Sequence, residues 1–258
     1  MIKRYAEMRP EELDAALAVN PAFLSAWGAL EWHGAHLPLG LDGIVAEAFS
    51  ERLAELANAI LLPASWLPIT TLPHPHSISI PTETVCALWR AMLDELVRVG
   101  GKTLCIVTGH YAQGHELELY RECGEAMARH EGVRIFAGSP LEFLRDDGLL
   151  DHAGRSETAQ LLALRPDLVR LGSFVPGPPA QNAVLGEDPR AATKEQGEQL
   201  IAAGLSAWQT AIENWTIGDL RAFYGEREKA YEPYRAGYFK ESWEQAIRDW
   251  WKAKGEVG

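Results

Sequence analysis

Residues 23–42 read FLSAWGALEWHGAHLPLGLD, an apolar run that passes directly into a polar loop. The apolar part, Phe23 to Leu30, is compact and predicts a buried strand. Glycine and proline residues then force a loop that carries two carboxylates and two imidazoles. Glu31 comes immediately after the strand, and burying an unpaired carboxylate is costly. We therefore expect Glu31 to have a partner at the end of this strand.

Strand-like and helical segments alternate outward from this stretch. Residues 82–99 carry Val85, Leu88, Met92, Leu96 and Val99 at helical spacing, and the glycine pair that follows ends the helix. Further strands are expected at 60–66, 103–108 and 133–137, further helices at 11–18, 43–59, 116–130 and 191–213, and an irregular loop at 172–190. This alternation predicts an α/β fold with a single doubly wound, mostly parallel sheet and helices on both faces.

The composition limits the classes of function. The chain has 258 residues, and 24 basic against 36 acidic side chains give a formal charge of −12. Such a charge disfavours binding to nucleic acid or to an anionic membrane surface. No apolar run approaches the roughly 18 residues of a membrane span, and no secretory signal is evident at the start. Three scattered cysteines form no C-x-x-C pair, so we expect reduced, buried thiols and a cytoplasmic protein.

Two further polar clusters follow predicted elements. His110 comes at the end of the strand 103–108, at the same sheet edge as Glu31. A third cluster, residues 151–158, turns from a loop into a helix and contains His152 and Glu157. Histidine and carboxylate side chains at the carboxyl ends of parallel strands are typical of a Zn, Mn or Fe site or of an acid–base site. The spacing leaves open whether one metal ion or two are bound.

At these residues the chain resembles the creatininase family of metal-dependent amidohydrolases. The resemblance covers about residues 20–210 and rests on a set of motifs in matching order. These are ExHGxHLPLGxD at 31–42, SISIPxET at 77–84, GH at 109–110, HAGxxET at 152–158 and ATKEQGE at 192–198. The first motif is specific, and the later ones gain weight together. The resemblance implies hydrolysis of a C–N bond in a small, foremost cyclic, amide.

The resemblance also implies a site with two divalent metal ions, Zn, Mn or Fe, and a hydroxide that bridges them. Glu31 and His110 would bind one ion, His33 the other, and Asp42 both. The second ion needs a further carboxylate. Where creatininase has a glutamate, this chain has Ala112. Glu157 is the first candidate to replace it and Glu116 the second.

Further roles follow from the same resemblance. His152 would be the catalytic histidine that protonates the leaving nitrogen, with Asp151 orienting it. Tyr111 and Ser77 would face the small-molecule substrate. Arg155 would favour an anionic substrate if it faced the pocket, although an exposed arginine at a helix start is an equally good interpretation. A non-catalytic binding or assembly protein on the same fold is the alternative, because Ala112 replaces a ligand and the chain ends in an aromatic tail.

That tail divides the chain into an α/β domain, 1–213, and a C-terminal extension, 214–258. The extension holds 10 of the 23 aromatic residues, and its charges balance. Trp243, Ile247, Trp250 and Trp251 form an amphipathic stripe. We expect the extension to pack on its own domain or, preferably, on a neighbouring subunit of a homo-oligomer, a hexamer or another multiple of a dimer or trimer.

Overall fold

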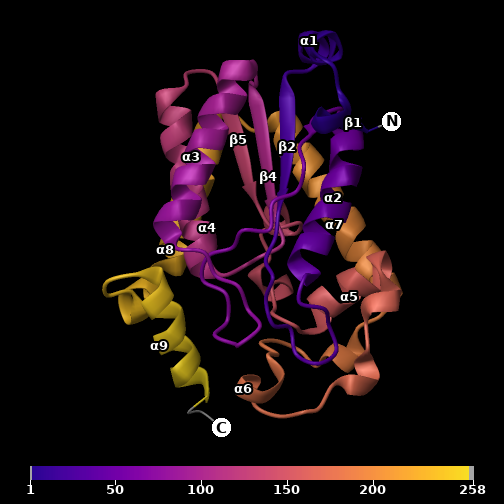
Figure 1. Cartoon of the computed structure of the whole chain (residues 1–258), viewed down its shortest axis with the longest axis vertical. Helices are drawn as coiled ribbons and strands as arrows, with labels where there is room; N and C mark the ends of the chain where they lie inside the picture. Colours follow the sequence, from indigo (N-terminus) through magenta and orange to yellow (C-terminus); the bar gives the residue numbers. More distant parts are fainter. Residues whose placement is uncertain (1, 256–258) are drawn as a thin grey trace.

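A computed structural model describes residues 2–255 of the chain and contains one five-stranded parallel sheet (Figure 1). The strands are β1 (Lys3–Arg4), β2 (Ala22–Trp27), β3 (Ile60–Leu61), β4 (Thr103–Thr108) and β5 (Arg134–Gly138), in the order β1-β3-β2-β4-β5. Every pairing is parallel. The predicted α/β class and doubly wound sheet are confirmed.

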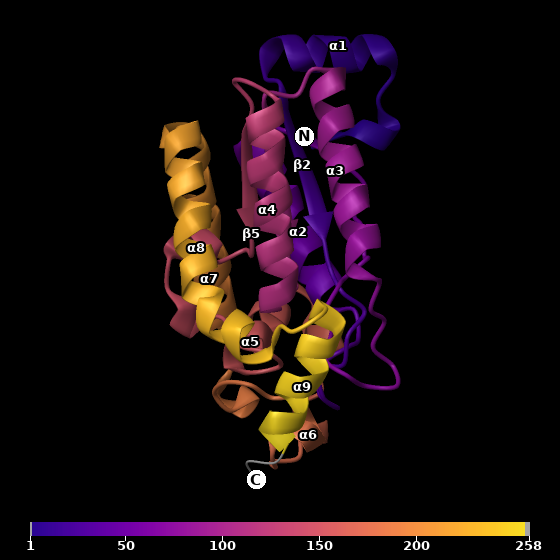
Figure 2. The same cartoon turned by 90° about the vertical axis from the view of Figure 1, so that its left-hand side faces the viewer.

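Helices cover both faces of this sheet (Figures 1 and 2). One layer has α2 (Leu41–Leu56) on β2 and β4, with α5 (Arg155–Leu164) and α7 (Lys194–Asn214) packed on α2. The opposite layer consists of α3 (Thr82–Val99), α4 (Gln113–Arg129) and α8 (Ile217–Tyr238). The remaining helices are α1 (Pro10–Val19), α6 (Pro179–Asn182) and α9 (Trp243–Gly255), with short 3₁₀ turns at Tyr5–Glu7, Glu142–Leu144, Asp147–Leu149, Pro166–Leu168, Leu171–Ser173 and Pro189–Ala191.

Several elements are shorter or rotated relative to the sequence expectation. The strand expected at 60–66 pairs as a strand only at Ile60–Leu61, because Pro63 follows and offers no N–H to the ladder. Helix α3 also buries a different face from the one that the sequence predicts. Leu88 is 41% exposed, whereas Trp89 and Leu93 are fully buried. Trp89 packs edge-on against Trp27 of β2, and this large contact sets the rotation of the helix.

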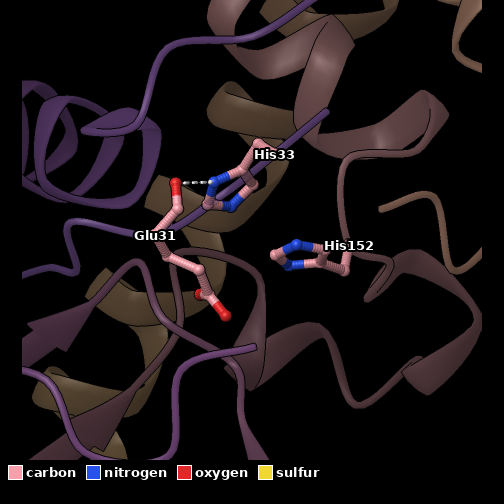
Figure 3. A group of neighbouring side chains, drawn as sticks. All are labelled: Glu31, His33 and His152. Atoms are coloured by element: carbon pink, nitrogen blue, oxygen red, sulfur yellow. Dashed lines mark hydrogen bonds between the residues drawn. The ribbon is translucent and has the colours of Figure 1, made fainter. Parts of the chain in front are cut away.

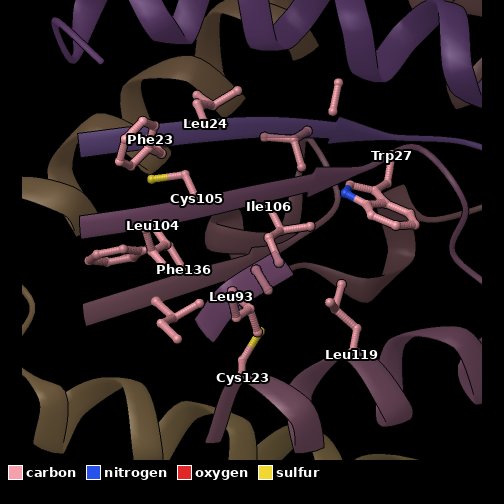
Figure 4. Close-up of a cluster of buried hydrophobic side chains, with 14 of the residues drawn as sticks. Phe23, Leu24, Trp27, Leu93, Leu104, Cys105, Ile106, Leu119, Cys123 and Phe136 are labelled. Atoms are coloured by element: carbon pink, nitrogen blue, oxygen red, sulfur yellow. The ribbon is translucent and has the colours of Figure 1, made fainter. Parts of the chain in front are cut away.

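The core lies between the sheet and its helices (Figure 4). Phe23, Ile106 and Phe136 come from three adjacent strands, and Leu119 and Cys123 of α4 pack over them. All three cysteines are buried and free of disulfides, in agreement with the expectation of buried thiols. None of the described helices has the length and apolar content needed to cross a membrane.

The chain reverses its winding direction between β2 and β4. The loop after β2 leads to α2 on one face, and the loop after β4 leads to α4 on the other. A crevice therefore opens between the carboxyl ends of these two strands, which is where ligands bind in open α/β sheets. Glycines keep its walls close. A Cβ on Gly28 would lie 2.2 Å from Cα of Gly43, and one on Gly109 would lie 2.1 Å from the carbonyl oxygen of Asp42.

The C-terminal extension packs on its own chain. Helix α8 contacts α4 and β5, and α9 contacts α8 and α6 beyond the carboxyl ends of the strands (Figure 2). Trp243 donates its indole N–H to Glu118 (2.7 Å), and Glu244 accepts from both the backbone and the hydroxyl of Thr82. Contact with a neighbouring subunit stays a prediction.

Replacing Gly28 by Ala should destabilise the protein, because the new methyl group would collide with the backbone of Gly43. Overpacking of this kind costs about 1–3 kcal/mol. Gly124→Ala is the matched control. It lies in α4 with nothing within 4 Å of the added carbon, and helix propensity favours it by up to about 1 kcal/mol. Urea unfolding of both variants tests this, and a G28A protein as stable as the wild type would contradict the close packing at this crevice.

Candidate metal centre

Four separate segments deliver buried ionisable side chains to the crevice. Glu31 and His33 come from the loop after β2, Asp42 from the first turn of α2, His110 from the end of β4, and Glu157 from the first turn of α5. All five are at most 3% exposed. The first-turn positions of Asp42 and Glu157 suit carboxylates, which the helix dipole stabilises.

These side chains form two trios that share Asp42. In the first trio, Nδ1 of His110 lies 2.9 Å from Oε2 of Glu31 and 3.3 Å from Oδ2 of Asp42. In the second, Nε2 of His33 lies 3.0 Å from Oδ1 of Asp42 and 3.6 Å from Oε2 of Glu157. Each trio can present its ligand atoms to one metal ion. Asp42 therefore turns one oxygen toward each trio.

The tautomers of the two histidines follow from their other ring nitrogens. Nε2 of His110 lies 2.9 Å from the carbonyl oxygen of Ile69. Nδ1 of His33 lies 3.0 Å from the carbonyl oxygen of Glu31 (Figure 3). A carbonyl only accepts, so each of these nitrogens carries a hydrogen, and in the neutral form of the ring the lone pair of the other nitrogen faces the carboxylates. Lone pairs facing carboxylates repel unless a cation lies between them, and a carbonyl behind the ring is the usual arrangement of a metal-binding histidine.

The unpaired atoms of the site fit such cations. Among residues 2–255, buried side-chain atoms without a hydrogen bond include Oε2 of Glu31, Nε2 of His33 and both oxygens of Asp42. Buried polar atoms are rarely left unpaired, and these four belong to the two trios. Imidazole nitrogens mixed with carboxylate oxygens suit Zn, Mn or Fe. The residues present therefore fit two divalent ions that share Asp42.

The electrostatics of the centre are those of a cation site. Burial would lower the pKa of His33, but Asp42 and Glu157 outweigh it and raise that pKa to about 10. Burial raises the pKa of Glu157 well above its usual range, only partly opposed by His33. The pocket thus concentrates negative charge that protons alone neutralise at a high cost.

A set of hydrogen bonds holds Glu157 in place. Its Oε2 accepts from the backbone N–H of Ala153 at 2.6 Å. The Ala153 carbonyl in turn accepts from Nε2 of His36 at 2.9 Å. Ala153 has a positive φ of 52°, an unusual conformation for a residue with a side chain. His36 is therefore a positioning residue, a role that sequence reasoning missed although His36 lies in the first motif.

His152 lies beside Glu31 and His33 (Figure 3). Its ring stacks on that of His33 at 4.3 Å, and its Nε2 donates to the carbonyl of Trp32 at 3.0 Å. Burial and the neighbouring His33 lower the pKa of His152 to about 4. A neutral ring with Nε2 protonated leaves Nδ1 as a free acceptor.

The other residues singled out in the sequence have different surroundings. Asp151 accepts from the backbone N–H of Ser156 and of Glu157, so it holds the start of α5 in place of the expected contact with His152. Arg155 bonds Glu187 and Gln196 and is not among the residues around the cavity. The hydroxyl of Ser77 accepts from the backbone N–H of Trp32 and so supports the loop that carries Glu31 and His33.

A cavity of about 290 Å³ opens beside the centre. Glu31, Asp42, His110, His152 and Glu157 line its polar side. Tyr111 and Ala112 line it as well, which fits the expectation that Tyr111 faces substrate. Residues of α8 and α9, in the C-terminal extension, also line the cavity. Sequence reasoning missed these residues, whose only signal was the aromatic stripe.

Comparison with known proteins gives a family for this site. The sequence model of the family described as creatininase, creatinine amidohydrolase, matches residues 6–212. The chain belongs to the creatininase family. The extension from α8 onward lies outside the matched residues.

Individual relatives and structures agree with this assignment. Creatinine amidohydrolase of Pseudomonas putida is 26% identical over 198 residues, covering 67% of this chain and 76% of that protein. Mycofactocin precursor peptide peptidase of Mycobacterium tuberculosis (strain ATCC 25618 / H37Rv) is 28% identical over 234 residues. The match covers 77% of this chain and 87% of that protein. A solved Mn form of creatininase shares the fold, with a TM-score of 0.73 and 22% identity. The match covers 82% of this chain and 98% of that chain. A Zn–Zn form of a creatininase mutant also shares the fold, with a TM-score of 0.72 and 22% identity. The match covers 82% of this chain and 97% of that chain.

The two carboxylates considered for the second ion lie in different places. Glu157 takes part in the trio with His33 and Asp42. Glu116 lies elsewhere, where it accepts from the hydroxyls of Tyr120 and Tyr231. Of the two candidates, only Glu157 is close to the other ligands.

Replacing Glu157 by Gln should reduce metal content from two equivalents per chain toward one, because the amide removes the charged ligand of the second trio. Glu116→Gln is the matched control, a buried carboxylate of the same kind that should keep both equivalents. Elemental analysis of protein purified without chelator measures the ratio. Loss of metal from E116Q but not from E157Q would contradict the assignment.

Proposed function

We propose that this protein is a metal-dependent hydrolase that cleaves a C–N bond in a small amide, foremost a cyclic amide. The observation that carries the proposal is Asp42, which turns one carboxylate oxygen to each of two histidine–carboxylate trios beside a cavity. Two equivalents of a divalent ion, Zn, Mn or Fe, are the proposed cofactor.

The roles of the chain's own residues follow from the geometry. Glu31 and His110 would hold one ion, His33 and Glu157 the other, and Asp42 both. When bound, a pair of divalent ions lowers the pKa of a bound water and polarises a carbonyl oxygen. The Ile69 and Glu31 carbonyls keep both imidazoles in the tautomer that ligation needs.

His152 is the proposed proton carrier. Its Nε2–H is held by the Trp32 carbonyl, so Nδ1 is the atom that exchanges protons. Because Nε2 carries the hydrogen in this contact, Nδ1 of the neutral ring has the lone pair that can accept a proton. Nδ1 would take the proton of the attacking water and deliver it to the leaving nitrogen, in the manner of a general base and then a general acid.

The size of the cavity supports a small substrate. Its volume of about 290 Å³ is at the lower end of the usual range for small-molecule pockets. Helices α8 and α9 contribute residues to its lining and so limit its size. Both features favour a compact amide over a long peptide, although one group of relatives is named for peptide hydrolysis.

Three observations favour the hydrolase over the alternative of a binding or assembly protein. Glu157 supplies the carboxylate that Ala112 lacks. The aromatic tail lines the cavity and leaves about 290 Å³ open. A retained histidine with a free acceptor nitrogen beside the trios serves a reaction rather than binding alone.

The test is turnover by protein loaded with Mn or Zn. Creatinine, hydantoin and dihydrouracil form the panel, with a peptide amide as comparison. We expect ring opening of at least one cyclic amide, its loss after treatment with chelator, and its return on adding metal. Two bound equivalents without turnover of any member would favour the binding protein.

His152→Ala should lower kcat by about 10²–10⁴-fold while both metal equivalents remain, because the variant loses proton transfer but no ligand of either trio. His74→Ala is the control. His74 stacks on Trp32 outside the cavity. Steady-state kinetics and metal analysis on the same samples separate the two effects. Unchanged kcat in H152A would rule out the assigned role.

A further inference from the structure

Part of the cavity lining is aromatic and comes from the C-terminal extension. Tyr231 and Tyr234 of α8 and Ile247 and Trp250 of α9 line the same cavity as Glu31, Asp42 and His110. We call these four residues the C-terminal wall. All four lie beyond the residues that match the creatininase family. The wall is therefore a feature of this chain's own extension, and its chemistry is additional to the family site.

Buried polar contacts fix the α8 part of the wall. Arg227, Tyr231 and Tyr234 are spaced at i, i+4 and i+7 and share one helix face. Nε of Arg227 pairs with Glu142 at 2.8 Å, and the hydroxyl of Tyr231 donates to Glu116 at 2.6 Å. Because its hydroxyl is engaged on Glu116, Tyr231 has mainly its ring to offer a ligand.

The α9 part is held in a similar way. Trp243 anchors the helix through Glu118, and Trp251 packs edge-on against Trp32 at 6.4 Å. Between these contacts, Ile247 and Trp250 reach the cavity. Trp250 meets the ring of Tyr234 at 6.1 Å and 75°. Two rings from different helices thus form a corner into which a flat group can fit.

The charges around the wall disfavour an anionic group there. Arg227 is the one lysine or arginine among the described residues that line the cavity, and Nζ of Lys254 lies 5.5 Å from the ring centre of Trp250 outside that lining. Its guanidinium already bonds Glu142, Asp147 and Tyr231. Asp147 and Asp151 add negative charge to the lining, and Arg155, the expected anion contact, lies elsewhere. A neutral group suits this environment better than a carboxylate.

We propose that the C-terminal wall binds a neutral, planar apolar group of the substrate, such as an aryl ring, while the metal ligands face the scissile amide. This inference rests on the proposed function and narrows it. Substrates would be compact amides that carry a flat apolar substituent, and Trp250 and Tyr234 would be specificity-determining residues. Aromatic contacts of this kind are worth about two- to twelvefold in affinity beyond simple burial.

The test uses two hydroxamates, which bind metal ions through the same pair of oxygens. Phenylacetohydroxamate carries an aryl ring, and acetohydroxamate does not. Calorimetric titration of the full-length Mn-loaded protein should show about tenfold or tighter binding of the aryl compound. Trp250→Ala should remove most of that difference, and Tyr234→Ala should reduce it. Trp251→Phe is the matched control. It lies outside the cavity, keeps an aromatic ring against Trp32, and should preserve the difference.

The possible failures are distinguishable. Equal affinity for the two hydroxamates in the wild type would overturn the wall proposal and leave the hydrolase intact. An undiminished preference in W250A and Y234A would do the same. Failure of the Mn-loaded protein to bind either hydroxamate would overturn the metal hydrolase and the wall together. Should W250A fold poorly, Trp250→Phe, which keeps an aromatic face, must retain the preference that Y234A loses.

Discussion

The structure depends on Asp42, whose two carboxylate oxygens face two different histidine–carboxylate trios. This carboxylate is 1% exposed and has a histidine nitrogen 3.0 Å from one oxygen and another 3.3 Å from the other. Glu31 and Glu157 add two more buried carboxylates within the same trios. Negative charge at this density is stable in a protein interior only with cations among the side chains. Much of the surrounding backbone serves to bring these groups together and to orient them.

The winding of the sheet makes this sharing possible. Asp42 begins a helix on one face, and His110 ends a strand whose connection turns to the other face. The two meet only because Gly109 lets β4 pass against the backbone of Asp42. Backbone carbonyls of Ile69 and Glu31 then set both imidazole tautomers. The metal centre is thus built into the switch point of the fold, and the extension closes the cavity from outside.

Local patterns predicted much of this arrangement. Apolar spacing, glycine signals and the family motifs predicted the strand at 103–108, the helix at 82–99 and the polar loop after Phe23–Leu30. Choosing between Glu157 and Glu116 was beyond such patterns, because both are buried carboxylates in the first turn of a helix. Only tertiary packing distinguishes them. The partners of Asp151 and Arg155 also depend on tertiary packing: Asp151 accepts from backbone amides, and Arg155 bonds side chains distant in sequence. Tertiary packing likewise decides that residues of α9 line the cavity.

The most direct test of a shared Asp42 is the electron paramagnetic resonance spectrum of the protein loaded with two equivalents of Mn(II). A carboxylate that bridges two ions places them close enough for magnetic coupling, so the account predicts the spectrum of an exchange-coupled pair. Asp42→Ala should abolish that spectrum. A wild-type spectrum of isolated Mn(II) ions at two bound equivalents would contradict the bridging role of Asp42.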